Sequence, residues 1–217
     1  MKKIFTLLLL ALFVQFSYAQ EETQEEMKNN RDDINTIFSK ENLKVTGGYI
    51  SPEIKVGNVN EDVSLFVGGR LGMILNDHFT LGIAGYGLAN NSNFKDLDPL
   101  SLNPDLRINM GYGGLLMEYT FFSNKKIHFS IPVVVGAAGI YIYEDDNNYF
   151  YNNYDDIENS AAFVVEPGVN IEFNLFKFLK LDLGASYRIV TQTSLVYLED
   201  EDLSDLSINA TFKFGFF

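Results

Sequence analysis

Apolar and polar residues alternate with a period of two over most of the chain from Leu43 onward. Such alternation predicts half-exposed β-strands rather than helices. The most regular case is the final stretch, LSINATFKFGFF at 206–217, in which apolar and polar side chains take turns. Turn-rich stretches divide the pattern into eight predicted strands. These strands are residues 43–57, 62–75, 79–89, 108–122, 127–143, 161–175, 180–194 and 206–217.

The connections between these strands differ strongly in length. Short turns are expected at 76–78, 123–126 and 176–179, and long loops at 90–107, 144–160 and 195–205, with the first loop, 58–61, as a short exception. Tight turns at one end and long loops at the other are typical of membrane barrels, whose turns lie in the periplasm. We therefore predict an all-β fold, an eight-stranded antiparallel up-and-down transmembrane β-barrel with periplasmic N- and C-termini.

Each predicted strand has one apolar and one polar face. In 180–194, Lys180, Asp182, Ser186 and Arg188 share the polar face. Alternation alone does not reveal which face points outward, and a soluble periplasmic ligand-binding barrel would keep its apolar face inside. Three features favour an apolar face toward lipid: both signs of charge on the polar face, aromatic residues near the predicted periplasmic rim, and a nearly uncharged opposite face.

The first 42 residues lack this pattern. Lys2 and Lys3 precede the apolar stretch 4–16, and Ser17-Tyr18-Ala19 places small residues before a cleavage point. This arrangement predicts a signal peptide at 1–19. Residues 20–42 are charged and lack alternation, so we expect a flexible acidic periplasmic N-terminal tail. The barrel then covers 43–217, in the outer membrane, exported by a cleaved signal peptide.

Charge and cysteine content narrow the function. The formal net charge of −13 makes nucleic acid a poor partner, because nucleic-acid binding asks for Lys and Arg patches. The chain has no cysteine, which excludes disulfides and a lipidated cysteine.

Two segments carry a wider resemblance. FVVEPGVNIEFNLFKFLKLDLGASYRIV at 163–190 and NKKIHFSIPVVVGAAGIYIYED at 124–145 resemble hairpins of small outer-membrane β-barrel proteins of the Bacteroidetes type, comparable in architecture to OmpA/OmpX-like barrels. The resemblance implies outer-membrane lipid as a partner and a barrel fold. It implies no activity, because that family is defined by architecture.

The last strand has a second meaning under this resemblance. It resembles the C-terminal signal that barrel-insertion machinery recognises, with Phe212, Phe214, Phe216 and Phe217 as its aromatic residues. Phe217 falls out of phase with the other three. A closed barrel also needs an ordered last strand, since an unpaired edge would otherwise remain.

Charged residues on the predicted polar faces are candidates for a lumen charge network. They are Lys55, Arg70, Glu118, Glu166, Glu172, Asp182 and Arg188. Such charges could set ion preference in a narrow porin or transport channel. Eight strands, however, enclose a space that side chains just fill. We therefore expect a packed network in a barrel with a structural or surface-interaction role, with the channel as the alternative.

Two predicted extracellular loops are strongly acidic. Their carboxylates are Glu144, Asp145, Asp146, Asp155, Asp156, Glu158, Glu199, Asp200, Glu201 and Asp202. Clustered carboxylates suit a divalent cation such as Ca²⁺, and the interleaved tyrosines suit a surface ligand. The spacing does not match an EF-hand loop, so solvated surface loops are the simpler expectation.

Catalysis and cofactors are not expected. Barrel enzymes at the outer surface typically need a His general base near Ser or Asp. This chain has only His78 and His128, both placed near predicted periplasmic turns, and it lacks a phosphate-binding glycine loop. We predict no enzyme, no cofactor and no catalytic or metal centre.

Overall fold

The structure is a computed structural model that describes residues 44–60, 62–90, 106–144, 156–195 and 198–217. These residues belong to one compact unit, Lys44–Phe217, built from strands alone. The strands are β1 (Val45–Val59), β2 (Asp62–Leu75), β3 (Phe79–Leu88), β4 (Leu106–Phe121), β5 (Ile127–Glu144), β6 (Asp156–Phe176), β7 (Leu179–Thr191) and β8 (Asp205–Phe216). No helix within the described ranges is long and apolar enough to cross a membrane.

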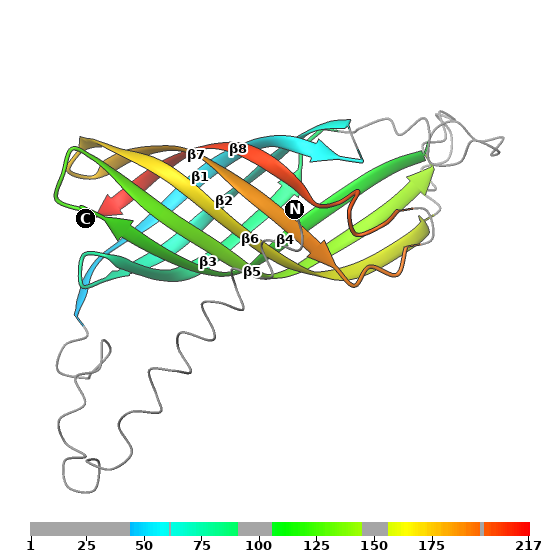
Figure 1. The fold of residues 1–217 in the computed structure, drawn as a ribbon, viewed down its shortest axis with the longest axis horizontal. Coiled ribbons are helices and arrows are strands. Elements are labelled where there is room, and N and C mark those ends of the chain that lie inside the picture. The colour runs from blue at the N-terminus through cyan, green and yellow to red at the C-terminus, as the bar shows by residue number, and fades with distance from the viewer. Residues whose placement is uncertain (1–43, 61, 91–105, 145–155, 196–197) are drawn as a thin grey trace, which may run out of the picture. The chain divides into compact units, whose positions relative to one another are not determined.

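The eight strands form a closed barrel in sequence order (Figure 1). Each strand pairs antiparallel with the next, and β8 pairs with β1, from Gly48 opposite Phe216 to Val56 opposite Ile208. This last pairing leaves no open edge, which explains why the alternation continues to the end of the chain. The predicted fold class is confirmed, and its periplasmic termini stay a prediction.

Most strand boundaries differ from the predicted ones by one to three residues, and two of the differences change the picture. β1 continues to Val59, so the connection to β2 shrinks to Asn60 and Glu61, with Asn60 in a left-handed conformation (φ 50°). β6 begins at Asp156 instead of residue 161, because its polar start pairs with the end of β5, Tyr143 opposite Asp156. Backbone pairing with a long partner strand overrides the polar composition of that segment.

The two ends of the barrel have different connections. One end, here called the turn end, carries the short turns β2–β3, β4–β5 and β6–β7 together with the C-terminus (Figure 1). Asn76 and Asp77 in the first of these turns have positive φ angles of 52° and 64°, which Asn and Asp tolerate better than most residues. The opposite end, here called the loop end, carries the β1–β2 turn and the connection 192–204.

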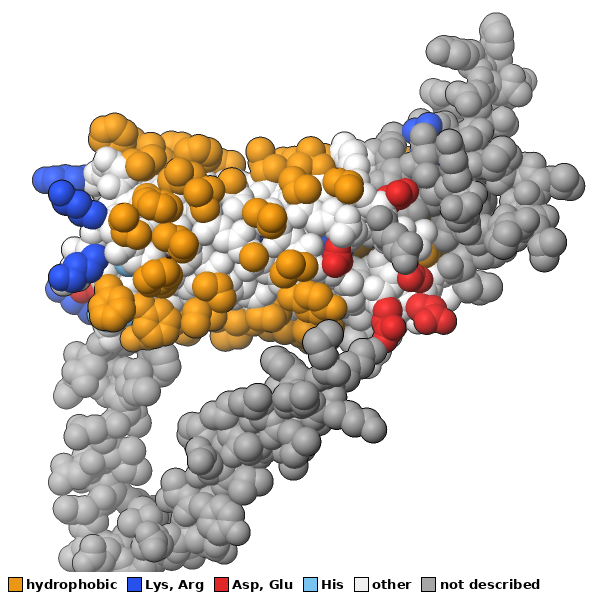
Figure 2. All heavy atoms as spheres, turned by 45° about the horizontal axis from the view of Figure 1, so that its top comes forward, with side chains coloured by type: hydrophobic (Ala, Val, Ile, Leu, Met, Phe, Trp, Pro, Cys, Tyr) orange, Lys and Arg blue, Asp and Glu red, His pale blue; other side chains and the backbone are white. Residues whose placement is uncertain are grey.

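The outer face of the barrel is apolar. Figure 2 shows a broad band of hydrophobic side chains across the visible face of the barrel wall. In β7, Leu183 and Tyr187 are about half exposed, whereas Asp182 and Arg188 are fully buried. The predicted faces of β7 are therefore correct, and an outward apolar surface of this extent is not that of a soluble barrel.

The lumen contains two layers. The half toward the loop end is apolar, with Ile108, Met110, Ile140, Ile142 and Val164 buried in one cluster. The half toward the turn end holds the buried charged side chains other than Arg188. The sequence analysis anticipated the charged layer and missed the apolar one.

Candidate functional site in the lumen

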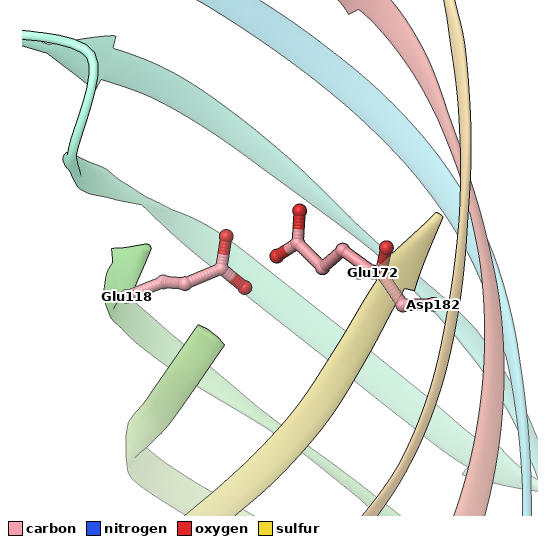
Figure 3. Close-up of side chains that lie close together, drawn as sticks. All are labelled: Glu118, Glu172 and Asp182. Carbon is pink, nitrogen blue, oxygen red and sulfur yellow. The ribbon is translucent and has the colours of Figure 1, made fainter. Parts of the chain in front are cut away.

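Lys213 of β8 lies at the centre of the charged layer. Its Nζ is 2.9 Å from Glu118 Oε1 of β4 and 2.8 Å from Glu172 Oε1 of β6. It is also 2.8 Å from Asp182 Oδ2 of β7. Figure 3 shows these three carboxylates on their separate strands. One ammonium group therefore ties together strands on different sides of the barrel.

The same three carboxylates are the group, among the described residues, whose oxygens lie close enough to share a metal ion, within 4.8 Å of one another. Hard cations favour carboxylate ligands of this kind. Here the Lys213 ammonium is within hydrogen-bonding distance of all three. The donor set is therefore already engaged by a cation of the chain itself, which gives no reason to assign a metal.

A second group forms around Glu53 of β1. Arg70 Nη2 donates to Glu53 Oε1 at 2.7 Å, and the Tyr86 hydroxyl donates to Glu53 Oε2 at 2.9 Å. Arg70 Nη1 also lies 3.5 Å from Glu118 Oε2. Glu118 thereby connects this group to the Lys213 cluster, so the two form one continuous network.

Lys55 and Glu166 extend the network toward the apolar layer. Lys55 Nζ donates to Glu166 Oε1, and the Tyr112 hydroxyl donates to Glu166 Oε2 at 2.5 Å. The Lys55 ammonium also lies 3.5 Å from the centroid of the Tyr86 ring, a favourable cation–π geometry. Tyrosine rings therefore form the boundary between the charged and the apolar layers.

His128 also belongs to the lumen. Its Nε2 is 2.9 Å from Glu172 Oε2, and its Nδ1 is 3.1 Å from the carbonyl oxygen of Lys125. His78, in contrast, lies at the β2–β3 turn, with Nδ1 3.1 Å from the Thr120 carbonyl oxygen. Both histidines lie near turns, as expected: His78 is in the β2–β3 turn, and His128 is the second residue of β5, with its side chain buried in the lumen.

Arg188 is buried but lies apart from the other predicted network residues. Its Nε donates to the Leu203 carbonyl at 2.8 Å and its Nη2 to the Asn58 carbonyl at 2.9 Å. No carboxylate of the described ranges is within ion-pairing distance of its guanidinium. The sequence grouping of Arg188 with the acidic residues is corrected: Arg188 anchors backbone at the loop end, because carbonyls are the acceptors within its reach.

The other six predicted lumen residues come together in one network: Lys55, Arg70, Glu118, Glu166, Glu172 and Asp182. Lys213, with three ion pairs, was not among the residues predicted from the sequence. Its position was visible in the alternation, since it shares a face with Ser207, Asn209 and Thr211. Its central role depends on the barrel's closure, which decides which strands face it across the lumen.

The charges in the lumen balance. The buried carboxylates are Glu53, Glu118, Glu166, Glu172 and Asp182, and the buried Lys and Arg side chains are Lys55, Arg70, Lys180, Arg188 and Lys213. The described lumen thus holds five negative and five positive side chains. A buried charge is tolerable only when it is paired and hydrogen-bonded, so balance is what a packed interior requires.

The loop end is closed by the connection 192–204. Leu198 and Leu203 are buried in the apolar cluster, and the Asp202 carbonyl accepts a 2.7 Å hydrogen bond from the Asn60 backbone N–H. This connection therefore folds back over the lumen instead of extending away from it.

The acidic residues of this connection serve local structure. The Asp200 carboxylate accepts hydrogen bonds from the Thr193 hydroxyl and from the backbone N–H groups of Thr193 and Gln192. These hydrogen bonds, led by that of the Thr193 hydroxyl, hold the pKa of Asp200 below its ordinary 3.8. Asp202 accepts a bond from the backbone N–H of Glu199 at 2.8 Å.

Only some of the remaining predicted acidic-loop residues lie in the described part of the chain. Glu158 lies in β6 and Glu201 in the 192–204 connection. Glu144 and Asp156 end β5 and begin β6, while Asp145, Asp146 and Asp155 lie outside the described residues. A divalent cation or surface ligand at these loops therefore stays a prediction.

The turn end is open to solvent. A depression of about 840 Å³ lies between the turns, lined by residues that include Phe176, Lys177, Lys180 and Phe217. Phe217 is turned away from the outward row of Phe212, Phe214 and Phe216, and stacks near Tyr49 at a centroid distance of 6.3 Å. This explains its phase difference, and the insertion signal itself stays a prediction.

Known outer-membrane proteins share this architecture. Residues 5–216 match the model of the outer membrane protein beta-barrel domain. Neisserial surface protein A has a TM-score of 0.50 at 12% identity, with 77% of this chain and 95% of that chain covered. Ail, the attachment invasion locus protein of Yersinia pestis, crystallised with the heparin analogue sucrose octasulfate, has a TM-score of 0.50 at 9% identity, covering 80% of this chain and 100% of that one.

At these identities the structural likenesses show the fold alone. No curated protein matches the chain. The family match covers nearly all of it, and the closed eight-stranded barrel with an apolar outer face agrees with that match. The chain belongs to the outer membrane protein beta-barrel domain family, and it is an outer-membrane protein.

Proposed function

We propose that this outer-membrane protein is a closed, non-conducting barrel with a structural or surface-interaction role. The observation that carries the proposal is the Lys213 ammonium, held between carboxylates of β4, β6 and β7 in the middle of the lumen. A charge bonded on several sides occupies the path that a solute would need. The lumen charges then act as a packed core rather than as a filter.

Two further features argue against the alternative of a narrow channel. Selectivity filters use rings of one charge sign, whereas the described lumen charges balance. Toward the loop end, an apolar layer and the buried leucines of the 192–204 connection follow the charged layer. A hydrated ion crossing the lumen would meet the ion-paired network first and then the dry apolar layer.

A non-enzymatic role is part of the proposal. A general base needs an accessible nitrogen within reach of its substrate. Both ring nitrogens of His128 contact other groups, Glu172 and the Lys125 carbonyl. His78 Nδ1 lies 3.1 Å from the Thr120 carbonyl oxygen and 3.4 Å from the Ser123 hydroxyl. The contacts of His128 on both nitrogens, and of His78 on one, support a non-enzymatic role.

The loop end is the proposed interaction surface. Its described acidic residues include Asp62, Glu199 and Asp202, so a cationic partner or a divalent cation suits it better than a sulfated one. The described part of the loop end is therefore a poor match for the polyanionic ligand of Ail. The turn end carries the lysines instead, and Figure 2 shows acidic side chains at one end and most of the basic ones at the other.

Site-directed labelling in intact cells tests the exposure that a surface role requires. The chain has no cysteine, so Glu199→Cys at the loop end and Asn124→Cys at the turn end each create a unique thiol. We expect a membrane-impermeant polymer maleimide to label Glu199→Cys on whole cells. Asn124→Cys should react only after the outer membrane is permeabilised. The reverse pattern would place the acidic end in the periplasm and overturn the proposed surface role.

A further inference from the structure

We propose that the turn end carries a binding surface for the phosphate groups of anionic phospholipids, formed by Lys125, Lys126 and Lys177. This surface is here called the lysine rim. The inference goes beyond the closed-barrel function, and it holds whether or not the lumen conducts.

Two hydrogen bonds from Asn174 place Lys125 and Lys126 at the turn that neighbours Lys177. The Asn174 backbone N–H donates to the Lys126 carbonyl at 2.9 Å, and its side-chain Nδ2 donates to the Lys125 carbonyl at 2.8 Å. The β4–β5 turn is thereby fastened to the end of β6, and Lys177 follows in the next turn. The rim is thus built on fixed backbone at neighbouring turns.

The three ammonium groups are available for a ligand. All three side chains are exposed, and no carboxylate of the described chain lies within 4.0 Å of any of them. Lys44 adds a further exposed cation at this end, and Asp77 is the exposed acid of the β2–β3 turn. The rim therefore has an excess of unpaired positive charge, while exposed acidic residues gather at the opposite end (Figure 2).

Aromatic residues place the rim at headgroup height. Lys177 lies between Phe176 and Phe178, whose exposed rings stack with centroids 5.7 Å apart. Phe122, at the start of the β4–β5 turn, is 65% exposed. Exposed aromatic side chains mark the membrane–water interface of barrels. Lysines beside such rings reach the level of the lipid phosphates.

Anionic phospholipid is the occupant that this chemistry favours. A lysine near a membrane surface is attracted to anionic lipid headgroups, and about fivefold per lysine is the expected scale of preference. The acidic loop end would repel the same lipids. A single rim with clustered lysines therefore predicts a preference for the anionic leaflet on one side only.

Lipid retention by the full chain tests the inference. The protein is refolded in nanodiscs of equimolar phosphatidylglycerol and phosphatidylcholine, then released, and the retained lipids are counted by native mass spectrometry. We expect at least about fivefold more phosphatidylglycerol than phosphatidylcholine at low salt. The preference should fall toward equal retention at high salt, because exposed charges are screened.

Two triple variants supply the controls. K125Q/K126Q/K177Q should lose the preference, and K125R/K126R/K177R should keep it. Equal retention of both lipids by the wild type, or an unchanged preference in the glutamine variant, would overturn the inference. So would loss of the preference in inorganic phosphate at matched ionic strength, which would reassign the rim to free phosphate. Heat-dependent gel mobility of each sample shows separately whether the barrel itself has folded.

Discussion

Lys213 shows how much a single side chain contributes to this interior. Its ammonium contacts three carboxylates that come from three different strands, and it lies 4.9 Å from the centroid of the Tyr49 ring. Bringing four ions out of water costs several kcal/mol for each ion. The arrangement persists because each carboxylate shares the same cation, so loss of that cation would leave three charges facing one another.

We predict that Lys213→Met destabilises the barrel by about 3–5 kcal/mol, the usual cost of removing one partner of a buried ion pair. Urea unfolding in lipid vesicles measures the change. Lys180→Met is the matched control, since Lys180 Nζ is 3.9 Å from its nearest carboxylate oxygen, on Glu172. Its loss should cost clearly less. Equal unfolding midpoints for wild type and Lys213→Met would refute a structural network.

Asp200 gives a prediction about pH. Its pKa is lowered in the folded state by hydrogen bonds from Thr193 and Gln192. A lowered folded pKa means that the stabilisation is fully present above the unfolded value of 3.8 and is lost as pH falls through the folded pKa. We expect the Thr193 amide to stay protected from hydrogen exchange at neutral pH and to lose protection below pH 3.8.

In Asp200→Asn the protection of the Thr193 amide should be weaker at neutral pH and should no longer depend on pH in the acidic range. Because Thr193 lies in the 192–204 connection at the loop end, the hydrogen exchange of its amide reports on this connection and not on the barrel strands. Protection in Asp200→Asn that matches the wild type over the whole range would show that the carboxylate does not hold this connection.

At the residue scale, sequence alone identifies which side chains face the lumen but not which ones touch. Alternation places Arg70, Glu118 and Glu166 inside. Contact between Lys213 of β8 and Glu118 of β4 depends on how the strands are staggered around the barrel. That stagger is set by all eight pairings together, so no local pattern contains it.

At the scale of the strands, β5 explains why the apolar layer was missed. Its segment IPVVVGAAGIYIY at 131–143 is apolar at nearly every position. A strand that is apolar on both faces reads as a continuous run. One face, with Ile131 and Tyr141, is exposed, and the other, with Ile140 and Ile142, is buried. This continuous apolar run was therefore the signal in the sequence from which the apolar layer of the lumen could have been predicted.

Glycines at which neighbouring strands lie very close together give a prediction at the scale of the strands. A Cβ added to Gly114 of β4 would lie 2.2 Å from the Val135 carbonyl oxygen of β5, whereas nothing lies within 4 Å of one added to Gly87 of β3. Gly114→Ala should cost about 1–3 kcal/mol, as overpacking does. Gly87→Ala should be neutral or slightly stabilising. The urea midpoints measure both, and similar midpoints would argue against close strand approach at Gly114.

Strand number was predictable because turn-rich stretches divide the period-two alternation into eight segments. The limits of the strands were harder to predict, as β6 shows by starting at Asp156. Long pairing partners extend a strand into polar sequence, since each added pair satisfies backbone groups. Local composition does not report the length of the partner.

At the scale of the whole molecule, three separations define the protein. The apolar belt faces outward, the ion-paired network fills the turn-end half of the lumen, and an apolar layer fills the other half. Most exposed lysines and most exposed acids lie at opposite ends (Figure 2). Together these separations describe a barrel that is anchored in lipid, filled inside, and different at its two ends.

Single-channel recording of the refolded protein in a planar bilayer tests the central claim most directly. A closed lumen should give no current steps in the bilayer, and a heat-dependent shift in gel mobility should show independently that the protein has folded. Stable, ion-selective conductance steps that weaken in Arg70→Ala or Glu166→Gln would contradict it. Such steps would make the lumen charges a filter and the protein a narrow pore.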